Sequence, residues 1–213
     1  MNAPSSLLHV AASPRAALSN SYRLGRQLAV GLSAAVPGMA VIDRPVGTAP
    51  PPAPDARFAA ESVIAASERL HAAYSDGLIA ELADAQMVVI STPMHNFTVP
   101  TALKAWIDQI VRSGRTFEGT PRGKRGLLAS KPVYLVVSCG GPVGNGVETQ
   151  QDFLTPYLHY LLGTIGLTDV RALRVDRLNQ GPERFEASMQ RGQAWVDEAV
   201  AAVTAPAARA ETA

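Results

Sequence analysis

A group of serine and asparagine residues follows the first apolar run of the chain, in "SPRAALSNS" (13–21). Ser19, Asn20 and Ser21 offer side-chain donors, and the apolar spacing after them predicts a helix that begins at this point. The N–H groups and the dipole at the start of a helix attract anions. The segment is therefore predicted to bind a phosphate, although the same residues can simply cap the helix.

The segment "TPMHNFT" (92–98) carries a different set of side chains, directly after a strand-like apolar run. Met94, His95 and Phe97 are flat or polarisable, and Asn96 adds an amide. This combination suits a planar ring with polar edges. The alternative is that Met94 and Phe97 are core residues at the base of a loop.

A third segment, "SCGGPVGNG" (138–146), also follows an apolar run. Gly140 and Gly141 lack side chains, so their backbone can lie close to a flat ligand, or they can form an ordinary turn. A phosphate site and a ring site together describe a mononucleotide, and FMN fits best. Cys139 is a possible nucleophile, but no general base is placed near it by the sequence, so we interpret it as an inert thiol.

Several other kinds of site are not supported by the sequence. The histidines have no HExxH-like spacing, and we expect no metal site. The chain contains no GxxxxGK[ST], and "GGPVGNG" follows the fourth predicted strand, unlike the GxGxxG of a dinucleotide fold. His9, His71 and His159 are predicted in a strand or on helices, in packing or surface roles.

Apolar runs alternate with amphipathic segments along the chain, which predicts five strands and five helical regions. The run at 85–92 is apolar on both faces, as in a central parallel strand. Strands are predicted at 7–11, 39–44, 85–92, 132–138 and 168–176. Helices are predicted at 20–35, 58–84, 100–114 and 182–203, and another helix is predicted to begin after an N-cap at Thr155. The helical region 58–84 is expected to be broken at 75–76. The segment 44–57 is predicted to be a proline-rich surface loop, and 116–131 a loop or small hairpin.

This alternation predicts a doubly wound α/β domain, and five strands favour the flavodoxin-like order 2-1-3-4-5 with helices on both faces. One domain is expected over residues 1–203, followed by a disordered tail at 204–213. In this order, the ends of strands one and three flank a ligand crevice, and the end of strand four lies beside it. The three polar segments are therefore expected to meet.

The composition is that of a soluble globular protein. Of 213 residues, 47% are hydrophobic and 17% charged, with a net charge of +1, which argues against a nucleic-acid partner. The single cysteine cannot form an internal disulfide, which suits a cytoplasmic location. We expect neither a signal peptide nor a membrane span.

The sequence resembles the family of flavodoxin-like, FMN-dependent NADH:quinone oxidoreductases and azoreductases, from about Leu7 to Val203. The most specific match is "PMHNFTVPTALKAWID" (93–108). "SNS", "SCGG", "TPYLHYLLGTIGLTDV" (155–170) and "GPE" (181–183) also resemble family motifs. The resemblance implies bound FMN, NADH or NADPH as reductant, a quinone or azo acceptor, and a homodimer with the flavin at its interface.

The resemblance also implies roles for individual residues. Cys139 replaces a common arginine, His95 replaces a common tyrosine, and "EGTPRGKRGLL" (118–128) departs from the usual lid sequence. Its basic residues could favour an anionic substrate or the phosphate of NADPH. The residues implied to hold the FMN phosphate are Ser13, Ser19, Asn20 and Ser21, and those implied to line the ring are Met94, His95, Asn96 and Phe97. The residues implied to close over the pyrimidine side of the ring are Ser138, Cys139, Gly140 and Gly141. The implied aromatic contacts to the substrate are Phe117 and Phe153.

The activity implied by the resemblance is a hydride relay with ping-pong kinetics, in which NAD(P)H and the acceptor use one pocket in turn. No side chain is expected to be indispensable as an acid or base; His95 is a candidate proton donor or substrate contact. The alternatives are a flavodoxin-type electron carrier and a flavin-binding structural or regulatory protein. Because flavodoxins are typically acidic, the near-neutral charge disfavours an electron carrier.

Overall fold

The computed structural model describes residues 5–61 and 73–204. Five parallel strands form the main sheet in the order β2-β1-β3-β6-β7. A separate antiparallel hairpin, β4 (Phe117–Thr120) and β5 (Gly123–Gly126), accounts for the gap in the numbering, so the predicted order 2-1-3-4-5 is confirmed. The strands of the main sheet are β1 (Ser6–Ala11), β2 (Ala40–Arg44), β3 (Met87–Pro93), β6 (Val133–Ser138) and β7 (Val170–Val175).

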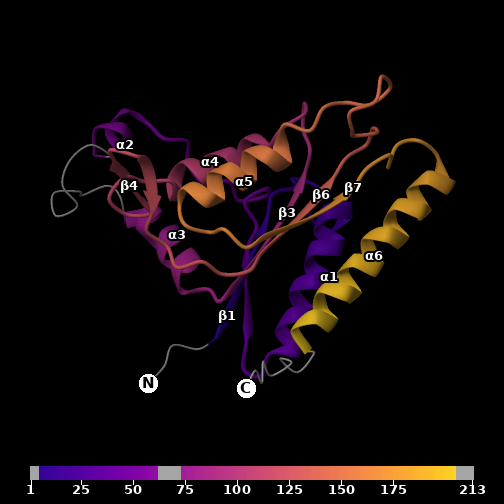
Figure 1. Cartoon of the computed structure of the whole chain (residues 1–213), viewed down its shortest axis with the longest axis horizontal. Coiled ribbons are helices and arrows are strands. Elements are labelled where there is room, and N and C mark those ends of the chain that lie inside the picture. Colours follow the sequence, from indigo (N-terminus) through magenta and orange to yellow (C-terminus); the bar gives the residue numbers. More distant parts are fainter. Residues whose placement is uncertain (1–4, 62–72, 205–213) are drawn as a thin grey trace, which may run out of the picture.

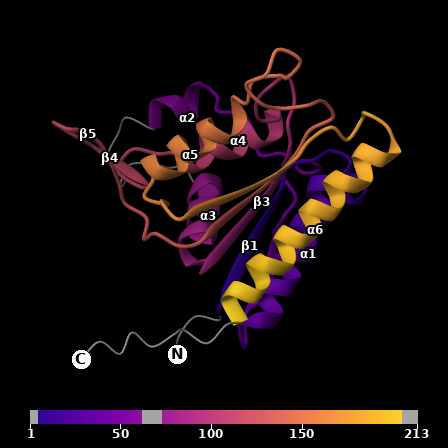
Figure 2. The same ribbon diagram turned by 45° about the vertical axis from the view of Figure 1, so that its right-hand side comes forward.

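Helices lie on both faces of this sheet (Figures 1 and 2). On one face, α1 (Asn20–Ala35) packs along α6 (Pro182–Thr204). On the other face lie α3 (Ala73–Asp84), α4 (Thr101–Ile110) and α5 (Leu154–Thr164). A short helix, α2 (Ala56–Glu61), and a 3-10 turn, η1 (Ala16–Leu18), complete the described elements.

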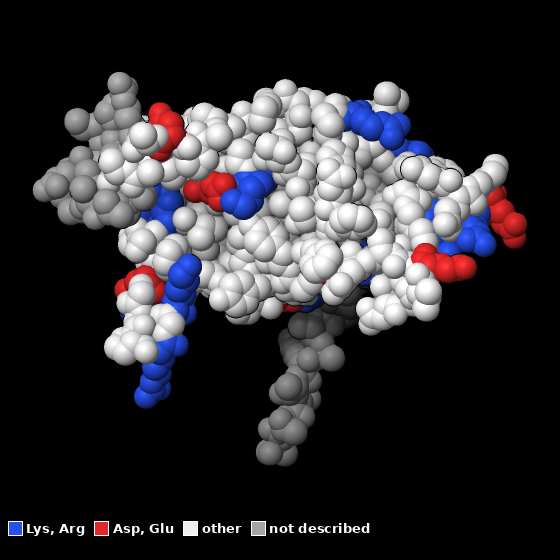
Figure 3. All heavy atoms as spheres, turned by 90° about the horizontal axis from the view of Figure 1, so that it is seen from above, with Lys and Arg blue, Asp and Glu red and all other residues white. Residues whose placement is uncertain are grey.

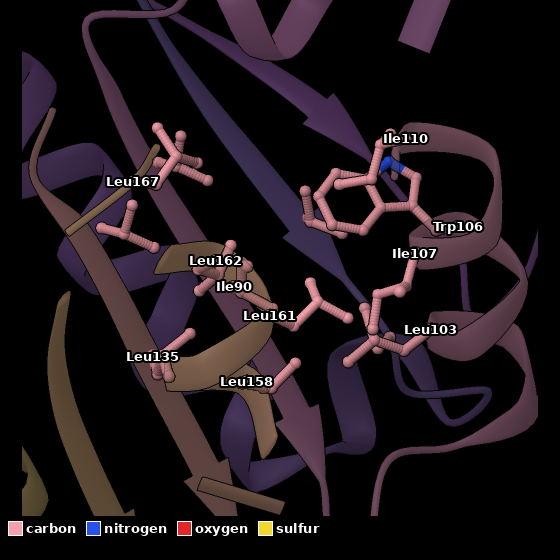
Figure 4. Close-up of a cluster of buried hydrophobic side chains, with 14 of the residues drawn as sticks. Ile90, Leu103, Trp106, Ile107, Ile110, Leu135, Leu158, Leu161, Leu162 and Leu167 are labelled. Atoms are coloured by element: carbon pink, nitrogen blue, oxygen red, sulfur yellow. The ribbon is translucent and has the colours of Figure 1, made fainter. Parts of the chain in front are cut away.

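The sheet separates two hydrophobic clusters, one on each face. The larger cluster lies under α3, α4 and α5, where Trp106 is only 1% exposed. Burial of each large apolar side chain contributes about 1.5–3 kcal/mol to stability, which fixes these helices on the sheet. Figure 4 shows the side chains of α4 and α5 meeting over the strands: Leu103, Trp106, Ile107, Ile110, Leu158, Leu161 and Leu162, with Ile90 and Leu135 from the sheet.

Two predicted helix boundaries are wrong, because side chains outside the helices bind the backbone at the helix ends. The helix predicted at 100–114 ends at Ile110, since the Thr116 hydroxyl donates to the Ile110 carbonyl at 2.7 Å and accepts from the Arg112 N–H at 2.9 Å. The predicted N-cap at Thr155 is also wrong. The Asp152 carboxylate instead accepts from the N–H groups of Leu154 and Thr155, at 3.0 and 2.8 Å.

The break predicted at 75–76 is absent, because α3 continues through both residues. Ser75 donates to the Gln109 carbonyl, and Asp76 pairs with Arg112 at 2.9 Å, so both polar side chains tie α3 to the end of α4. The small hairpin allowed for in 116–131 is confirmed as β4 and β5. Residues 62–72 of the predicted helical region and 205–213 of the predicted tail lie outside the described residues.

Candidate functional site

A pocket of about 230 Å³ opens at the carboxyl ends of β1, β3 and β6, where the fold brings the three polar segments together. The residues that line it come from these segments and from the loop after β7. They are Ser13, Pro14, Arg15, Ser19, Asn20, Pro93, Met94, His95, Ser138, Cys139, Gly140, Leu178 and Asn179.

The first wall of the pocket is the segment between β1 and α1. Ser19 occupies the N-cap position of α1, but its hydroxyl makes no hydrogen bond to the first turn. It bonds instead to the hydroxyl of Ser21 at 3.0 Å, and Ser21 is fully buried behind it, away from the pocket. Ser19 therefore occupies the N-cap position without a side-chain capping bond. The first N–H groups of α1, which have no intrahelical partner, remain available to an anion.

The backbone of this wall is held from behind by Gly47, in the loop after β2. Its N–H donates to the Ala11 carbonyl at 2.9 Å, and a Cβ at this position would lie 2.3 Å from the Ser13 carbonyl. Only glycine permits this approach. Ser13, which is 5% exposed, accepts from the Arg15 N–H at 3.2 Å, so its hydroxyl is fixed at the pocket wall.

The second wall contains a tight turn that decides which side chains reach the pocket. His95 and Thr98 exchange backbone hydrogen bonds of 2.9 and 3.0 Å. Between them, Asn96 and Phe97 have φ values of 46° and 71°, the left-handed geometry of a type I′ turn. Met94 and His95 consequently line the pocket, whereas the side chains of Asn96 and Phe97 are exposed outside its lining.

The third wall is the segment after β6, and the loop after β7 braces it. Leu178, Asn179 and Arg177 donate backbone hydrogen bonds to the carbonyls of Cys139, Gly140 and Gly141, at 3.2, 2.9 and 3.1 Å. A Cβ on Gly140 would lie 2.4 Å from the Asn179 amide nitrogen, so a larger residue here would displace the Asn179 side chain. Gly141 does not line the pocket.

The thiol of Cys139 is 5% exposed and lines the pocket. Burial raises the pKa of Cys139, and a hydrogen bond from the Gln150 side chain opposes this only partly. The thiol is therefore protonated at neutral pH and is a poor nucleophile. This geometry favours the inert thiol over the nucleophile.

The two aromatic residues expected to contact substrate do not line this pocket. Phe117 lies on the β4–β5 hairpin, where the Lys124 ammonium stacks 4.6 Å from its ring centre. Phe153 is 53% exposed, and its N–H donates to the Phe97 carbonyl at 3.3 Å.

The sequence prediction missed five lining residues. Pro14, Arg15 and Pro93 lie inside segments that were recognised. Leu178 and Asn179 come from a fourth strand end, after β7. The strand order already placed β7 beside β6, so this loop was the signal that the three-segment prediction overlooked.

Backbone strain gathers around the same pocket. Among the described residues, the non-glycine residues with positive φ are Ala16, Asn96, Phe97 and Arg177, and all lie in the segments that follow β1, β3 and β7. Such conformations cost on the order of 1–3 kcal/mol each and cluster at functional sites.

A second polar cluster lies under α1, where its histidine and serine are buried and its aspartate is partly exposed. His9, Asp43 and Ser91, here called the imidazole cluster, join β1, β2 and β3. Asp43 can only accept, so His9 Nδ1–H donates to it at 3.1 Å and Nε2 accepts from the Ser91 hydroxyl at 2.9 Å. Burial lowers the pKa of His9, although Asp43 opposes this effect.

The imidazole cluster has the connectivity of a serine hydrolase triad but not its accessibility. Ser91 is 1% exposed, and a Cβ added to Gly25 of α1 would lie 2.6 Å from the Ser91 Cβ. A nucleophile must reach its substrate, so this arrangement is structural.

Residues 5–61 and 73–204 contain neither a candidate metal site nor a membrane-spanning helix. No group of three or more histidine, cysteine, aspartate or glutamate side chains there is placed to hold a metal ion. No helix in these ranges combines the length and hydrophobicity needed to cross a membrane.

The chain is similar to known proteins of a flavin-binding family. A family model described as "Flavodoxin-like fold" matches residues 5–200. FMN-dependent NADH:quinone oxidoreductase 2 of Cupriavidus pinatubonensis is 46% identical, over 89% of this chain and 94% of its own length. FMN-dependent NADH:quinone oxidoreductase 5 of Burkholderia lata is 42% identical, over 88% and 91%.

A solved structure shares the fold. The FMN-dependent NADH-azoreductase from Bacillus anthracis, in complex with FMN, superposes with a TM-score of 0.81 at 19% identity, covering 94% of this chain and 99% of that one. At this identity the likeness concerns the fold alone. Together with the sequence relatives and the family match, the pocket at the carboxyl edge of the sheet leads to one assignment: this chain belongs to the flavodoxin-like family of FMN-dependent NADH:quinone oxidoreductases.

Proposed function

We propose that this protein binds FMN in the pocket at the carboxyl edge and uses NAD(P)H to reduce quinones and azo compounds. The observation that carries the proposal is a single pocket with an anion-binding wall on one side and flat or small residues on the other. The relatives named above carry the same cofactor and reductant in their names.

The first wall fits a phosphate. Ser13, Ser19 and Asn20 line it beside the start of α1, where the helix dipole and free N–H groups favour negative charge. Arg15 adds a guanidinium at the same wall. In this assignment Ser21 orients Ser19 and does not touch the phosphate itself.

The opposite walls fit a planar ring. Met94 and Cys139 present polarisable sulfur atoms, and Gly140 leaves room for a flat ligand to approach the backbone. Ser138 and Asn179 supply polar groups beside them. Asn96 and Phe97 would contribute backbone groups of the turn, because their side chains point away from the lining.

When bound, FMN supplies the hydride chemistry, and the protein's part is binding and orientation. The start of α1 would hold its phosphate, and Met94 and Cys139 would lie beside its ring. His95 lines the pocket and is exposed, so it can contact an acceptor or hold a proton for it.

Substitution of His95 by tyrosine separates these two roles. If His95 contacts the ring edge, which we expect, the variant retains FMN and most of the activity. If it donates a proton, reoxidation by the acceptor slows about 10²-fold or more, while reduction by NADH is unchanged. Stopped-flow measurement of the two half-reactions decides between them.

The proposed activity is tested with the purified protein. We expect acid extraction to release stoichiometric FMN, and NADH to be oxidised rapidly when menadione or an azo dye is present. Parallel double-reciprocal plots are expected, because reductant and acceptor use one pocket in turn. FMN-bound protein that does not oxidise NADH would indicate an electron carrier or a structural flavoprotein, and recovery of FAD would overturn the cofactor assignment.

We also infer that the protein is a homodimer formed through α4 and α5. Seen from above, the face over these helices carries few charged residues (Figure 3). Tyr160 of α5 is 79% exposed, and Tyr157 and Val99, together with Thr98, Thr101 and Lys104, line a depression between the two helices. Burial of such a face against a second copy follows from its hydrophobic character.

Light scattering at micromolar concentration tests the dimer. We expect Tyr160→Arg to weaken it, whereas Tyr74→Arg, on the exposed surface of α3, leaves it intact. A wild-type monomer with full activity would contradict the interface.

A further inference from the structure

One side chain beside the pocket has strong hydrogen-bond donors but only weak acceptors. The Gln150 amide nitrogen donates to the thiol sulfur of Cys139, and it lies 3.9 Å from the thioether sulfur of Met94. We call Met94, Cys139 and Gln150 the sulfur cluster. Both sulfur-bearing residues line the ring side of the pocket.

Gln150 is held in place by its own backbone. Its N–H donates to the Pro142 carbonyl at 3.0 Å, and its carbonyl accepts from the Gly144 N–H at 3.1 Å. The loop between β6 and α5, which Figures 1 and 2 show projecting beyond the sheet, is thereby closed at its base. The Val143 N–H donates to the Asp176 carboxylate at 3.0 Å and ties this base to the end of β7. The amide is thus directed at the pocket wall by a braced backbone.

The hydrogen-bond partners of this amide are weaker acceptors than its NH₂ group can use. An amide NH₂ is a strong double donor, whereas thiol and thioether sulfurs are weak acceptors. Within the described residues, no protein group donates to Gln150 Oε1, and no oxygen accepts from Nε2. The neighbouring Gly141 lies close to this amide, since a Cβ there would be 3.6 Å from Nε2, in ordinary van der Waals contact. A ligand oxygen is a better acceptor than either sulfur.

We propose that Gln150 is a positioning residue for the bound ring, and that its amide donates to an electron-rich oxygen on the ring edge. This inference rests on the proposed function. A ring that gains electrons carries more negative charge on its edge oxygens, so this hydrogen bond is stronger to the reduced ring. Gln150 therefore favours the reduced cofactor and raises its reduction potential.

The test is Gln150→Leu, which removes the donors and retains a similar volume. We expect reduced FMN to lose about tenfold more affinity than oxidised FMN, which lowers the two-electron midpoint potential by about 30 mV. The potential is measured by anaerobic equilibration with a reference dye, and the affinity of oxidised FMN by titration of the apoprotein. Neither measurement requires turnover.

Two further variants separate hydrogen bonding from loop packing. Gln151→Leu changes the adjacent exposed glutamine, which lies on a different depression of the same loop, and we expect a wild-type potential. Gln150→Glu retains the length but replaces donors with negative charge, so the potential should fall further than in Gln150→Leu. Equal potentials in the wild type, Gln150→Leu and Gln150→Glu would overturn the proposal. Equal loss of affinity for both redox states would overturn it as well.

The same measurements distinguish this inference from the proposed function. Protein that binds FMN and shows the shifted potentials, but does not oxidise NADH, would retain the role of Gln150 and refute the reductase. Protein that reduces quinones with unshifted potentials in both Gln150 variants would retain the reductase and refute the role of Gln150. Protein that binds no FMN would refute both.

Discussion

The imidazole cluster, within the sheet, and the sulfur cluster, at its carboxyl edge, are hydrogen-bonded very differently. In the first, His9 uses both ring nitrogens on oxygen partners, Asp43 and Ser91, under the cover of α1. In the second, the Gln150 amide meets only the sulfur atoms of Met94 and Cys139, the two residues of the cluster that line the pocket.

The difference separates polar groups that stabilise the fold from polar groups placed for a ligand. Buried polar side chains are costly unless they are paired, so a cluster that only holds strands together must satisfy its own donors and acceptors. Hydrogen-bond donors that have only weak acceptors beside a pocket can still donate to a ligand. Substitutions in the two clusters should consequently affect different properties.

The largest effect is expected from removal of the imidazole. His9→Ala leaves a cavity and an unpaired Ser91 hydroxyl in the sheet, and we expect a loss of about 3 kcal/mol in the free energy of unfolding. Urea unfolding measures it. His159→Ala, on the exposed surface of α5, should change stability by less than about 0.5 kcal/mol. A loss equally small at His9 would show that the imidazole cluster is not structural.

A smaller effect is expected from crowding the imidazole cluster. Gly25→Ala places a Cβ 2.6 Å from the Ser91 Cβ, so α1 must move away from β3, at a cost of about 1–3 kcal/mol. Gly77→Ala is the matched control, because nothing lies within 4 Å of a Cβ there. In that exposed helical position alanine should stabilise by up to about 1 kcal/mol. Thermal unfolding of both variants should therefore show shifts of opposite sign.

The free energy of unfolding should depend on pH because His9 is buried. Its pKa is lowered in the folded protein from the ordinary value of 6.5, so between these two values the unfolded chain binds more protons. The associated stability is present above pH 6.5 and is lost as the pH falls through this window, at up to about 1.4 kcal/mol per pH unit. His9→Gln should lack this component, whereas His159→Gln should retain it. Parallel pH profiles for the wild type and His9→Gln would contradict the assignment.

The smallest effect on stability is expected in the sulfur cluster. Gln150→Leu removes an amide with weak partners, so the unfolding free energy of the apoprotein should change by no more than about 0.5 kcal/mol. Urea unfolding without FMN measures it. A loss of about 2 kcal/mol or more would show that the Gln150 amide stabilises the fold, and the two clusters would then not differ in role.

The sequence by itself determined the order of the sheet, the helices α1 and α6, and the three segments around the pocket. These features depend on local periodicity and on the rule that parallel strands present their carboxyl ends at one edge. Ser19 and Met94 were identified in this way, at the start of a predicted helix and after a predicted strand, whereas the roles of Ser13 and Cys139 were implied by the family resemblance.

Only the tertiary structure decided which side chains face the pocket and which polar groups are paired. Phe97 turns outward because His95 and Thr98 pair across a left-handed turn. Gln150 reaches Cys139 only because a loop closes on its own backbone. Such contacts join residues with no shared periodicity, so their partners are set by the packing of the whole domain and leave no local pattern in the sequence.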